Sequence, residues 1–343
     1  MPNIKVRGVS KYFRSVQALS HLDLDIRDGE YVVLLGPSGC GKTTLLKIIA
    51  GILAPSSGTV FIAGKDVTLL PPEDRDIGFL FQNYALFPHL CALDNAAYGP
   101  IARGKMPDKA RRIAADMLAM VHLAGRENAL PRELSGGMQQ RLAMARALAT
   151  ESKLLFLDEP MNALDANIKV ELRNEIRRMA KKLKLTVVHV THDQEEGMAV
   201  ADKLVIMRKG EVLQVGSPSD VYHKPSCPFV ASFLGEANFL DAKFEKGKAV
   251  LLGHEVHANL IGEYVAVIRP ENLRFSAKGA MVKVVSSRSF GPFYKYEVDY
   301  SGIRLNVRTT HKYEETDHIA FDPKRVLYFK EPEEGLEKAI AAD

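Results

Sequence analysis

The chain has 343 residues, of which 46% are hydrophobic and 26% charged, an ordinary balance for a globular protein that excludes global disorder. The formal net charge of +4 is too small to indicate a nucleic-acid-binding protein by itself. The length favours two domains.

No uncharged apolar run reaches the roughly 20 residues that a membrane-spanning helix needs, and residues 1–7 lack the apolar block of a secretory signal. We therefore expect any membrane role to be that of a docked subunit. The three cysteines are scattered along the chain, which favours a reducing compartment over a disulfide framework.

Strand-like and helix-like segments alternate in the first two thirds of the chain. The apolar run 31–35 is followed by a glycine-rich turn and the helical stretch 43–50. Further apolar runs cover residues 77–81, 154–157 and 186–190. Continuous apolar strands separated by helices are typical of a parallel sheet that is buried on both faces.

Polar residues follow these runs at the predicted carboxyl ends of the strands. Gln82, Asp158 and His192 lie there, as does the loop that begins at Gly36. Ligands bind at this edge of parallel sheets. The pattern therefore predicts a binding site along the edge.

Two other regions differ from this alternation. Between residues 90 and 150 the apolar spacing is helical, with one helix expected to begin at Pro107 and to close by Gly125. After about residue 234, short alternating runs punctuated by glycines predict a small antiparallel β domain. The expected organisation is a first domain at 1–235 with a helical subdomain at about 84–150, a β domain at 236–330 and a polar tail at 331–343.

Residues 36–43 have the sequence Gly-Pro-Ser-Gly-Cys-Gly-Lys-Thr, which fits the phosphate-loop pattern Gly-x4-Gly-Lys-Ser/Thr. The glycines let backbone N–H groups wrap phosphates, and a following helix N-terminus favours anions. Lys42 can reach the β and γ oxygens, and the Thr43 hydroxyl suits Mg²⁺. A chance glycine turn is the alternative, but the flanking strand and helix disfavour it.

Asp158 and Glu159 follow the apolar run at 154–157. A carboxylate at a buried strand end beside phosphates can hold Mg²⁺ through water, which is the role expected for Asp158. Glu159 would face the γ-phosphate and orient or deprotonate the attacking water. Without a phosphate loop nearby, a solvated acidic turn would be the better interpretation.

Residues 134–141, Leu-Ser-Gly-Gly-Met-Gln-Gln-Arg, precede Leu157-Asp158-Glu159-Pro160. Together with the phosphate loop, and in this order, they resemble the signature of ATP-binding-cassette (ABC) ATPases over roughly residues 4–234. The resemblance implies an α/β fold, a P-loop NTPase ABC cassette with a mainly parallel sheet and a helical subdomain, followed by a small antiparallel β-barrel-like domain. It also implies ATP and Mg²⁺ as cofactors and hydrolysis of ATP to ADP and phosphate.

The resemblance assigns further roles. Phe13 stands where the family has the aromatic residue that stacks on adenine, with Tyr12 as the alternative. Gln82 matches the glutamine that senses the γ-phosphate, and it joins Thr43 and Asp158 as an expected metal ligand. The expected catalytic residues are Glu159, His192, Gln82 and Lys42. The other expected nucleotide-binding residues are Gly36, Pro37, Ser38, Gly39, Cys40, Gly41, Thr44, Ser135, Gly136, Gly137 and Asp165.

A head-to-tail homodimer is implied, with two ATP molecules in its seam. Residues 135–137 open a predicted helix, whose N-terminus would form a second anion-binding site. Because each chain already has a phosphate loop, this second site is best suited to the ATP that is bound by the partner chain. Departures from the family are few. Asn162 stands where the family often has serine, and Met138 where it often has glutamine.

Two side chains have simpler alternatives. Cys40 lies near Lys42 and a helix N-terminus, which could lower the pKa of its thiol, but a tolerated small residue whose alkylation blocks ATP is the simpler interpretation. His189 lies within a strand and is expected to be a core histidine.

Residues 268–271 and 83–89 resemble those of importer ATPases that carry a regulatory β domain, often called the transport-associated oligonucleotide/oligosaccharide-binding-like (TOBE) domain. The resemblance implies a peripheral protein on the cytoplasmic face of the cell membrane. Its partners would be a second copy, two membrane permease subunits and, indirectly, an extracytoplasmic solute-binding protein.

The junction at residues 235–239, Gly-Glu-Ala-Asn-Phe, resembles that of polyamine, ferric-iron, phosphonate, sulfate and molybdate importers, with sugar as the alternative substrate. A soluble ABC ATPase acting on DNA or ribosomes is the competing function. The absence of a long coiled coil, the single cassette and the mild charge disfavour it, so no nucleic-acid partner is expected. Retention of Glu159 and His192 disfavours a scaffold without turnover.

Overall fold

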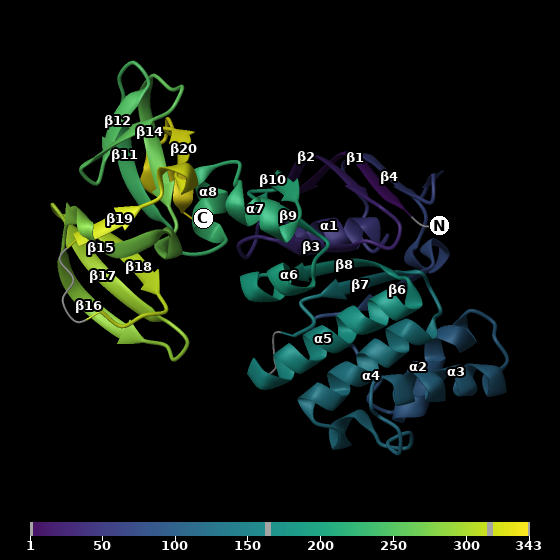
Figure 1. Cartoon of the computed structure of the whole chain (residues 1–343). Coiled ribbons are helices and arrows are strands. Elements are labelled where there is room, and N and C mark those ends of the chain that lie inside the picture. The colour runs from purple at the N-terminus through teal and green to yellow at the C-terminus, as the bar shows by residue number, and fades with distance from the viewer. Residues whose placement is uncertain (1–2, 162–165, 314–317, 342–343) are drawn as a thin grey trace. The chain divides into compact units, whose positions relative to one another are not determined.

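The computed structural model describes residues 3–161, 166–313 and 318–341 (Figure 1). Backbone contacts divide the chain into two units, Met1–Ser219 and Asp220–Asp343. Among the described residues, no helix combines the length and the apolar character needed to cross a membrane.

A six-stranded sheet forms the centre of the first unit, in the order β10-β9-β3-β8-β7-β6. All of its neighbouring strands are parallel except β10, which is antiparallel to β9. Every residue of β3, β7 and β8 is buried, which explains why apolar residues dominate their sequences. The predicted parallel sheet is therefore confirmed. Its strands are β3 (Tyr31–Leu35), β6 (Ile77–Leu80), β7 (Leu154–Asp158), β8 (Thr186–Thr191), β9 (Lys203–Arg208) and β10 (Glu211–Gly216).

Helix α1 (Lys42–Ile49) and a second, antiparallel sheet share a core with one face of the parallel sheet. Val32 and Val188 belong to this core, whereas Val33 and Leu35 point to the other face, where α6 (Gln194–Val200) packs. Helix α5 (Ala166–Leu183) connects β7 to β8. The antiparallel sheet, which the sequence patterns do not predict, has the order β2-β1-β4-β5, with strands β1 (Ile4–Phe13), β2 (Val16–Ile26), β4 (Ser57–Ile62) and β5 (Lys65–Asp66).

The helical subdomain contains α2 (Ala92–Ala102), α3 (Pro107–Met120) and α4 (Gly136–Ala149), which pack against one another. Helix α3 begins at Pro107, as predicted, but ends at Met120. His122, not Gly125, is the first left-handed residue after it, with φ of 57°. Two short 3-10 helices, η1 (Pro72–Arg75) and η2 (Pro131–Glu133), lie in the connecting loops.

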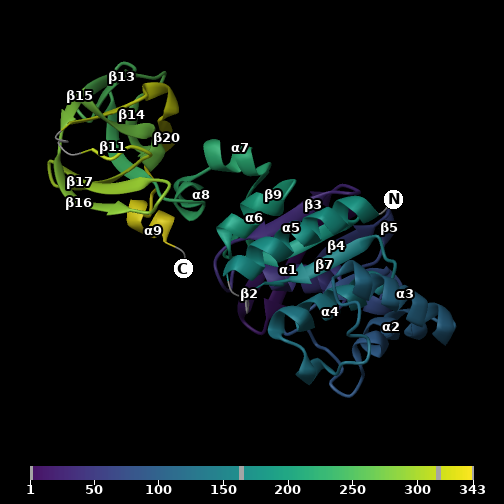
Figure 2. The same ribbon diagram turned by 60° about the horizontal axis from the view of Figure 1, so that its bottom comes forward.

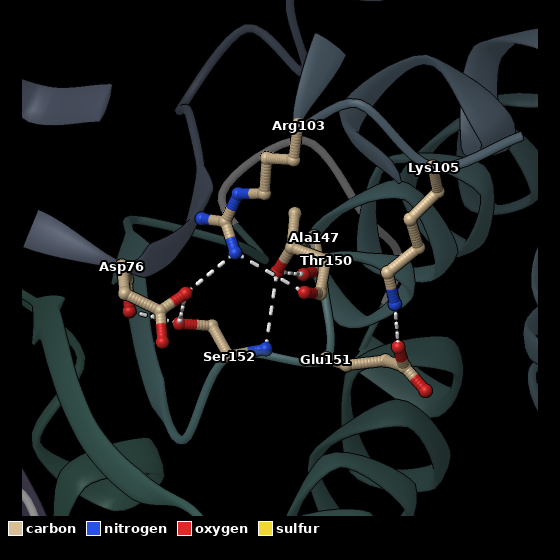
Figure 3. A network of polar contacts seen from close by, with 7 residues as sticks. All are labelled: Asp76, Arg103, Lys105, Ala147, Thr150, Glu151 and Ser152. Atoms are coloured by element: carbon tan, nitrogen blue, oxygen red, sulfur yellow. Dashed lines mark hydrogen bonds and ion pairs between the residues drawn. The ribbon is translucent and has the colours of Figure 1, made fainter. Parts of the chain in front are cut away.

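A polar network anchors this subdomain to the edge of the parallel sheet (Figure 3). Arg103, which follows α2, donates from Nη1 to a carboxylate oxygen of Asp76 and to the carbonyl of Thr150, at 3.1 Å. The Ser152 hydroxyl donates to the carbonyl of Asp76. Because Asp76 and Ser152 lie just before β6 and β7, these bonds tie the end of α2 to the loops that lead into both strands.

The second unit is an antiparallel β domain with short flanking helices, and its strands surround a common core (Figure 2). The sheets have the orders β11-β14-β20, β12-β13, β15-β19 and β16-β17-β18. Its strands are β11 (Asn238–Phe244), β12 (Lys248–Leu251), β13 (His254–His257), β14 (Gly262–Ile268), β15 (Leu273–Met281), β16 (Lys283–Ser289), β17 (Tyr294–Tyr300), β18 (Ile303–Thr309), β19 (His318–Phe321) and β20 (Leu327–Lys330). Helix α7 (Pro218–His223) spans the division between the units, and the helical elements of the second unit are α8 (Pro228–Phe233), η3 (Pro270–Asn272), η4 (Pro323–Arg325) and α9 (Leu336–Ile340).

The division between the units lies before the predicted boundary at residues 235 and 236. Arg269 is buried and donates to the carbonyl oxygens of Ala231, at 2.7 Å, and Gly235, at 3.1 Å. Ala231 also belongs to a buried cluster with Val265 and Val267 of β14. These contacts place the segment around α8 with the β domain.

Candidate functional site

The loop at residues 36–41 joins β3 to α1 and is held tightly against neighbouring backbone. A Cβ atom on Gly36 would lie 2.3 Å from the carbonyl oxygen of Met207, and one on Gly41 would lie 2.6 Å from that of Ala18. Gly41 also has φ of 103°, which only glycine adopts readily. Gly39 has φ of 79° and open space on its Cβ side. Glycine at positions 36 and 41 therefore lets the loop lie directly against neighbouring backbone.

Lys42 begins α1 and is 5% exposed. Its Nζ donates to the carbonyl oxygens of Gly36, at 2.7 Å, and Pro37, at 2.6 Å. The ammonium group thus lies inside the curve of the loop among neutral acceptors. Anionic phosphate oxygens form stronger hydrogen bonds with an ammonium group than carbonyls do, so this arrangement fits a nucleotide phosphate.

The remaining loop residues differ in exposure. Ser38 and Gly39 are exposed, and Pro37 and Thr44 are half-buried. Cys40 is buried, and burial raises the pKa of its thiol although Lys42 opposes the shift. The hypothesis that this environment lowers the pKa of Cys40 is therefore wrong, because desolvation outweighs the nearby cation.

Two oxygen-bearing side chains meet beside the loop. The Thr43 hydroxyl, in the first turn of α1, donates to Asp158 Oδ1 at 2.8 Å. Asp158 is the last residue of β7 and is 3% exposed. Burial raises the pKa of this carboxyl, while the Thr43 hydroxyl and Lys47 oppose the shift. A hydroxyl and a carboxylate at this separation are a donor set that suits Mg²⁺.

Glu159 is held where the chain leaves β7. Its backbone is left-handed, with φ of 47°, and its N–H donates to the carbonyl of Val190 at 2.9 Å. Its Oε1 lies 3.5 Å from His192 Nδ1, and its Oε2 accepts from Gln82 Nε2 at 3.3 Å. The structure thus brings together three predicted residues from the ends of β6, β7 and β8. Gln82 contacts Glu159, whereas Thr43 and Asp158 contact each other.

The other predicted residues lie apart from this group. Ser135 caps the 14-residue helix α4, accepting from Met138 N–H at 3.4 Å, and it is exposed together with Gly136, while Gly137 is half-buried. Phe13 and Tyr12 are 46% and 49% exposed, so exposure does not distinguish them as adenine-stacking residues. Lys11 Nζ lies 5.3 Å from the centre of the Phe13 ring. Asp165 and Asn162 lie outside the described residues.

The sequence patterns missed an apolar groove of about 360 Å³ beside the loop that follows Gln82, lined in part by Phe79, Phe87 and Tyr98. Arg146 of α4 donates to two backbone carbonyls of this loop, both at 2.6 Å. Its guanidinium lies 5.6 Å from the centre of the Phe87 ring. The sequence feature that could have indicated this groove is the group of aromatic residues at positions 79, 81 and 87.

Comparisons with known proteins agree with this geometry. The ABC transporter family model matches residues 19–162. The chain is 43% identical over 309 residues to the Fe(3+) ions import ATP-binding protein FbpC of Brucella abortus (strain 2308), covering 87% of this chain and 88% of the relative. It is 40% identical over 316 residues to the FbpC protein of Escherichia coli (strain K12), covering 90% and 91%.

A solved structure, the dimeric post-hydrolysis state of the ATP-binding cassette MJ0796 bound to ADP and Pi, has a TM-score of 0.58 and 33% sequence identity. The similarity covers 63% of this chain and 98% of that chain.

Proposed function

Because the chain belongs to the ABC transporter family, as an ATP-binding importer subunit that hydrolyses ATP to drive solute uptake, we propose that it powers the import of ferric iron. The observation that supports ATP hydrolysis as the power source is the meeting of Gln82, Glu159 and His192 at adjoining strand ends beside the phosphate loop. The chain binds ATP as a member of this family, and the roles below are those that the geometry supports.

The triphosphate would lie in the curve of the loop, with Lys42 turning from the carbonyls of Gly36 and Pro37 to the β and γ oxygens. Mg²⁺ would be held by the Thr43 hydroxyl, by Asp158 through water, and by the side-chain oxygen of Gln82. When bound, the metal neutralises charge on the β and γ oxygens. Asp158 would accept a hydrogen bond from a metal-bound water, so it would act as the ionised carboxylate.

Hydrolysis requires a water molecule that attacks the γ-phosphorus in line with the leaving ADP. Glu159 would accept the proton of this water as the new P–O bond forms, and ADP leaves as the bond to the β-phosphate oxygen breaks. The His192 imidazole, 3.5 Å from Glu159, would contact the γ-phosphate and hold the carboxylate in place. Gln82, whose Nε2 donates to Glu159 Oε2 at 3.3 Å, would help to orient the same water.

A second copy would complete each ATP site. The exposed N-terminus of α4, with Ser135 and Gly136, offers backbone N–H groups to an anion. A head-to-tail dimer would set this terminus against the γ-phosphate held by the partner's phosphate loop. The similarity to a dimeric cassette supports this arrangement. ATP would then join the two subunits, and hydrolysis would release them.

We assign the groove beside the Gln82 loop to a helix of a membrane permease subunit. Its walls carry aromatic rings, and Tyr98 remains 48% exposed. Arg146 ties the loop to α4, so a helix seated in the groove would act directly on the segment that follows Gln82. The protein would accordingly lie on the cytoplasmic face of the membrane, with the solute-binding protein on the other side.

Ferric iron is the proposed solute because the similar importer proteins carry that name, and the 235–239 junction is compatible with it. Polyamines, sulfate, phosphonate, molybdate and sugars are the competing solutes. Uptake of each radiolabelled solute should be compared in cells that carry the wild-type chain or Glu159→Gln. Loss of ferric-iron uptake alone supports the proposal, and loss of another solute's uptake alone refutes it.

The permease partnership has its own test. Tagged Glu159→Gln protein with ATP should capture polytopic membrane proteins from solubilised membranes, whereas the Lys42→Ala variant of the same protein should capture fewer. Recovery of ribosomes or nucleic acid in their place would favour the competing soluble ATPase.

A further inference from the structure

A buried polar network lies between the parallel sheet and α6, on the face opposite α1. The Tyr31 hydroxyl lies 3.1 Å from His189 Nδ1, and His189 Nε2 lies 3.1 Å from Glu196 Oε1. The other carboxylate oxygen, Oε2, accepts from the Thr191 hydroxyl at 2.7 Å. All four side chains are buried. Both oxygens of the Glu196 carboxylate therefore face a donor-bearing group of the sheet.

The proton arrangement follows from the surroundings. Burial raises the pKa of Tyr31, so its hydroxyl remains protonated beside His189 Nδ1. The other ring nitrogen of His189, Nε2, lies 3.1 Å from Glu196 Oε1. Burial alone would raise the pKa of Glu196, but its contacts with His189 and Thr191 outweigh burial and hold that pKa below its usual value. Glu196 is thus an ionised carboxylate inside the protein.

The same carboxylate is linked to the loop that carries His192. The Thr191 hydroxyl oxygen accepts from the N–H of Asp193 at 3.0 Å while donating to Glu196. On the other side, Asp193 Oδ1 accepts from the N–H of Glu196 at 3.0 Å and so caps α6. The residues before and after His192 are therefore both tied to Glu196. His192, whose side chain is 49% exposed, projects from this fixed turn toward Glu159.

Helix α6 is seated unusually close to the sheet. A Cβ atom on Gly197 would lie 2.3 Å from Leu35 Cδ1 and 3.4 Å from Val33 Cγ1. Because residue 197 has no side chain, α6 packs directly on β3 and holds Glu196 within reach of β8. Close packing leaves little freedom for the carboxylate to move.

We propose that Glu196 is a positioning residue for ATP hydrolysis, whose buried carboxylate fixes the 191–193 turn and so holds His192 against Glu159. The inference rests on the role proposed above for His192. It assigns Glu196 no contact with the nucleotide, because its carboxylate is occupied by His189 and Thr191 on the buried side of the loop.

Substitution of Glu196 by glutamine tests the proposal with a side chain of the same size. A carboxamide has one acceptor oxygen, so one of the two groups facing it, Thr191 or His189, meets an NH₂ group. Displacement of a reacting group by about 1 Å can cost about a hundredfold in rate. We expect kcat to fall by roughly tenfold to a hundredfold with ATP affinity unchanged. Glu195→Gln, at the exposed neighbouring position, is the matched control and should retain kcat.

Thr191 supplies an independent pair of variants. Thr191→Val removes the hydroxyl at constant shape and should lower kcat as Glu196→Gln does. Thr191→Ser keeps the hydroxyl, so its kcat should remain close to that of the parent protein. These variants also serve if Glu196→Gln fails to fold, which thermal unfolding followed by circular dichroism would reveal.

The decisive comparison uses the His192→Ala background. If Glu196 acts through His192, Glu196→Gln should lower kcat in the parent protein and cause no further loss in His192→Ala. An equal loss in both backgrounds, or an unchanged kcat in the parent, would overturn the inference while leaving the proposed function intact. If His192→Ala itself retains full kcat, the proposed role of His192 and this inference both fail.

Discussion

Replacement of Arg75 by methionine should destabilise the first unit by about 3 kcal/mol. Arg75 is 4% exposed and ends η1. Its guanidinium donates at 2.8–3.0 Å to the carbonyl oxygens of Ile48, Ile49, Thr68 and Leu70. Two of these carbonyls belong to the last turn of α1, the helix that Lys42 begins, so the substitution acts on the element that carries the phosphate loop.

The size of this destabilisation depends on whether each of the four carbonyl oxygens finds another hydrogen-bond donor when Arg75 is replaced. The Ile48 oxygen keeps a second donor, the N–H of Gly51 at 3.1 Å. The buried Ile49 oxygen loses the donor that Arg75 supplies, and an unsatisfied buried acceptor costs about 1–3 kcal/mol. The bonds to the two more exposed carbonyls are replaced by water and contribute about 1 kcal/mol more. Removal of a buried charge offsets part of this cost.

Scanning calorimetry of the full chain measures the effect. For a unit of this size, about 3 kcal/mol corresponds to a fall of roughly 6–12 °C in the midpoint of unfolding. Arg75→Lys keeps the charge but forms fewer of the bonds, so its midpoint should be intermediate. A midpoint within about 2 °C of wild type for Arg75→Met would refute the argument that these hydrogen bonds hold the end of α1.

Further variants test the phosphate loop. Lys42→Ala should weaken binding of a fluorescent ATP analogue by at least roughly tenfold; unchanged affinity would contradict a phosphate contact. Gly36→Ala places a Cβ 2.3 Å from the Met207 carbonyl oxygen, so it should abolish ATP binding, and retained affinity would contradict the tight packing. Because burial raises the pKa of Cys40, less of its thiol is ionised at neutral pH, and iodoacetamide should label it more slowly than Cys227. The Cys40 rate should keep rising with pH above the usual thiol range, as peptide mass spectrometry can follow; equal rates at neutral pH would contradict the shift.

The parallel sheet was predictable because a strand that is buried on both faces has a recognisable run of apolar residues in the sequence. Strands β3, β7 and β8 are buried throughout and are rich in apolar residues, and polar or glycine residues stand at or just after their carboxyl ends. The strands of the antiparallel sheet do not show a sequence pattern of this kind. Its first strand, β1, has register shifts after Val6, Val9 and Lys11, which interrupt the alternation that predicts a half-buried strand.

Some residues of the candidate site could likewise be predicted from the sequence, and others could not. Lys42, Glu159 and His192 were found by motif, and their convergence follows from strand ends that share one edge. The network around Glu196 could not be predicted, because an acidic residue in the first turn of a helix is ordinary on a surface. Only the fold shows that this carboxylate is buried against β8. The division of the chain at residues 219 and 220 has no local sequence signal, because the contacts of Arg269 with the preceding segment join residues that are distant in sequence.

The central claim, that ATP joins two copies of this chain and hydrolysis separates them, is tested most directly by sedimentation velocity of full-length Glu159→Gln with and without ATP and Mg²⁺. The account predicts a species of twice the chain mass with ATP, a monomer without it, and a monomer under both conditions when Lys42→Ala is added to the same chain. A Glu159→Gln protein that binds ATP but remains a monomer would contradict the account.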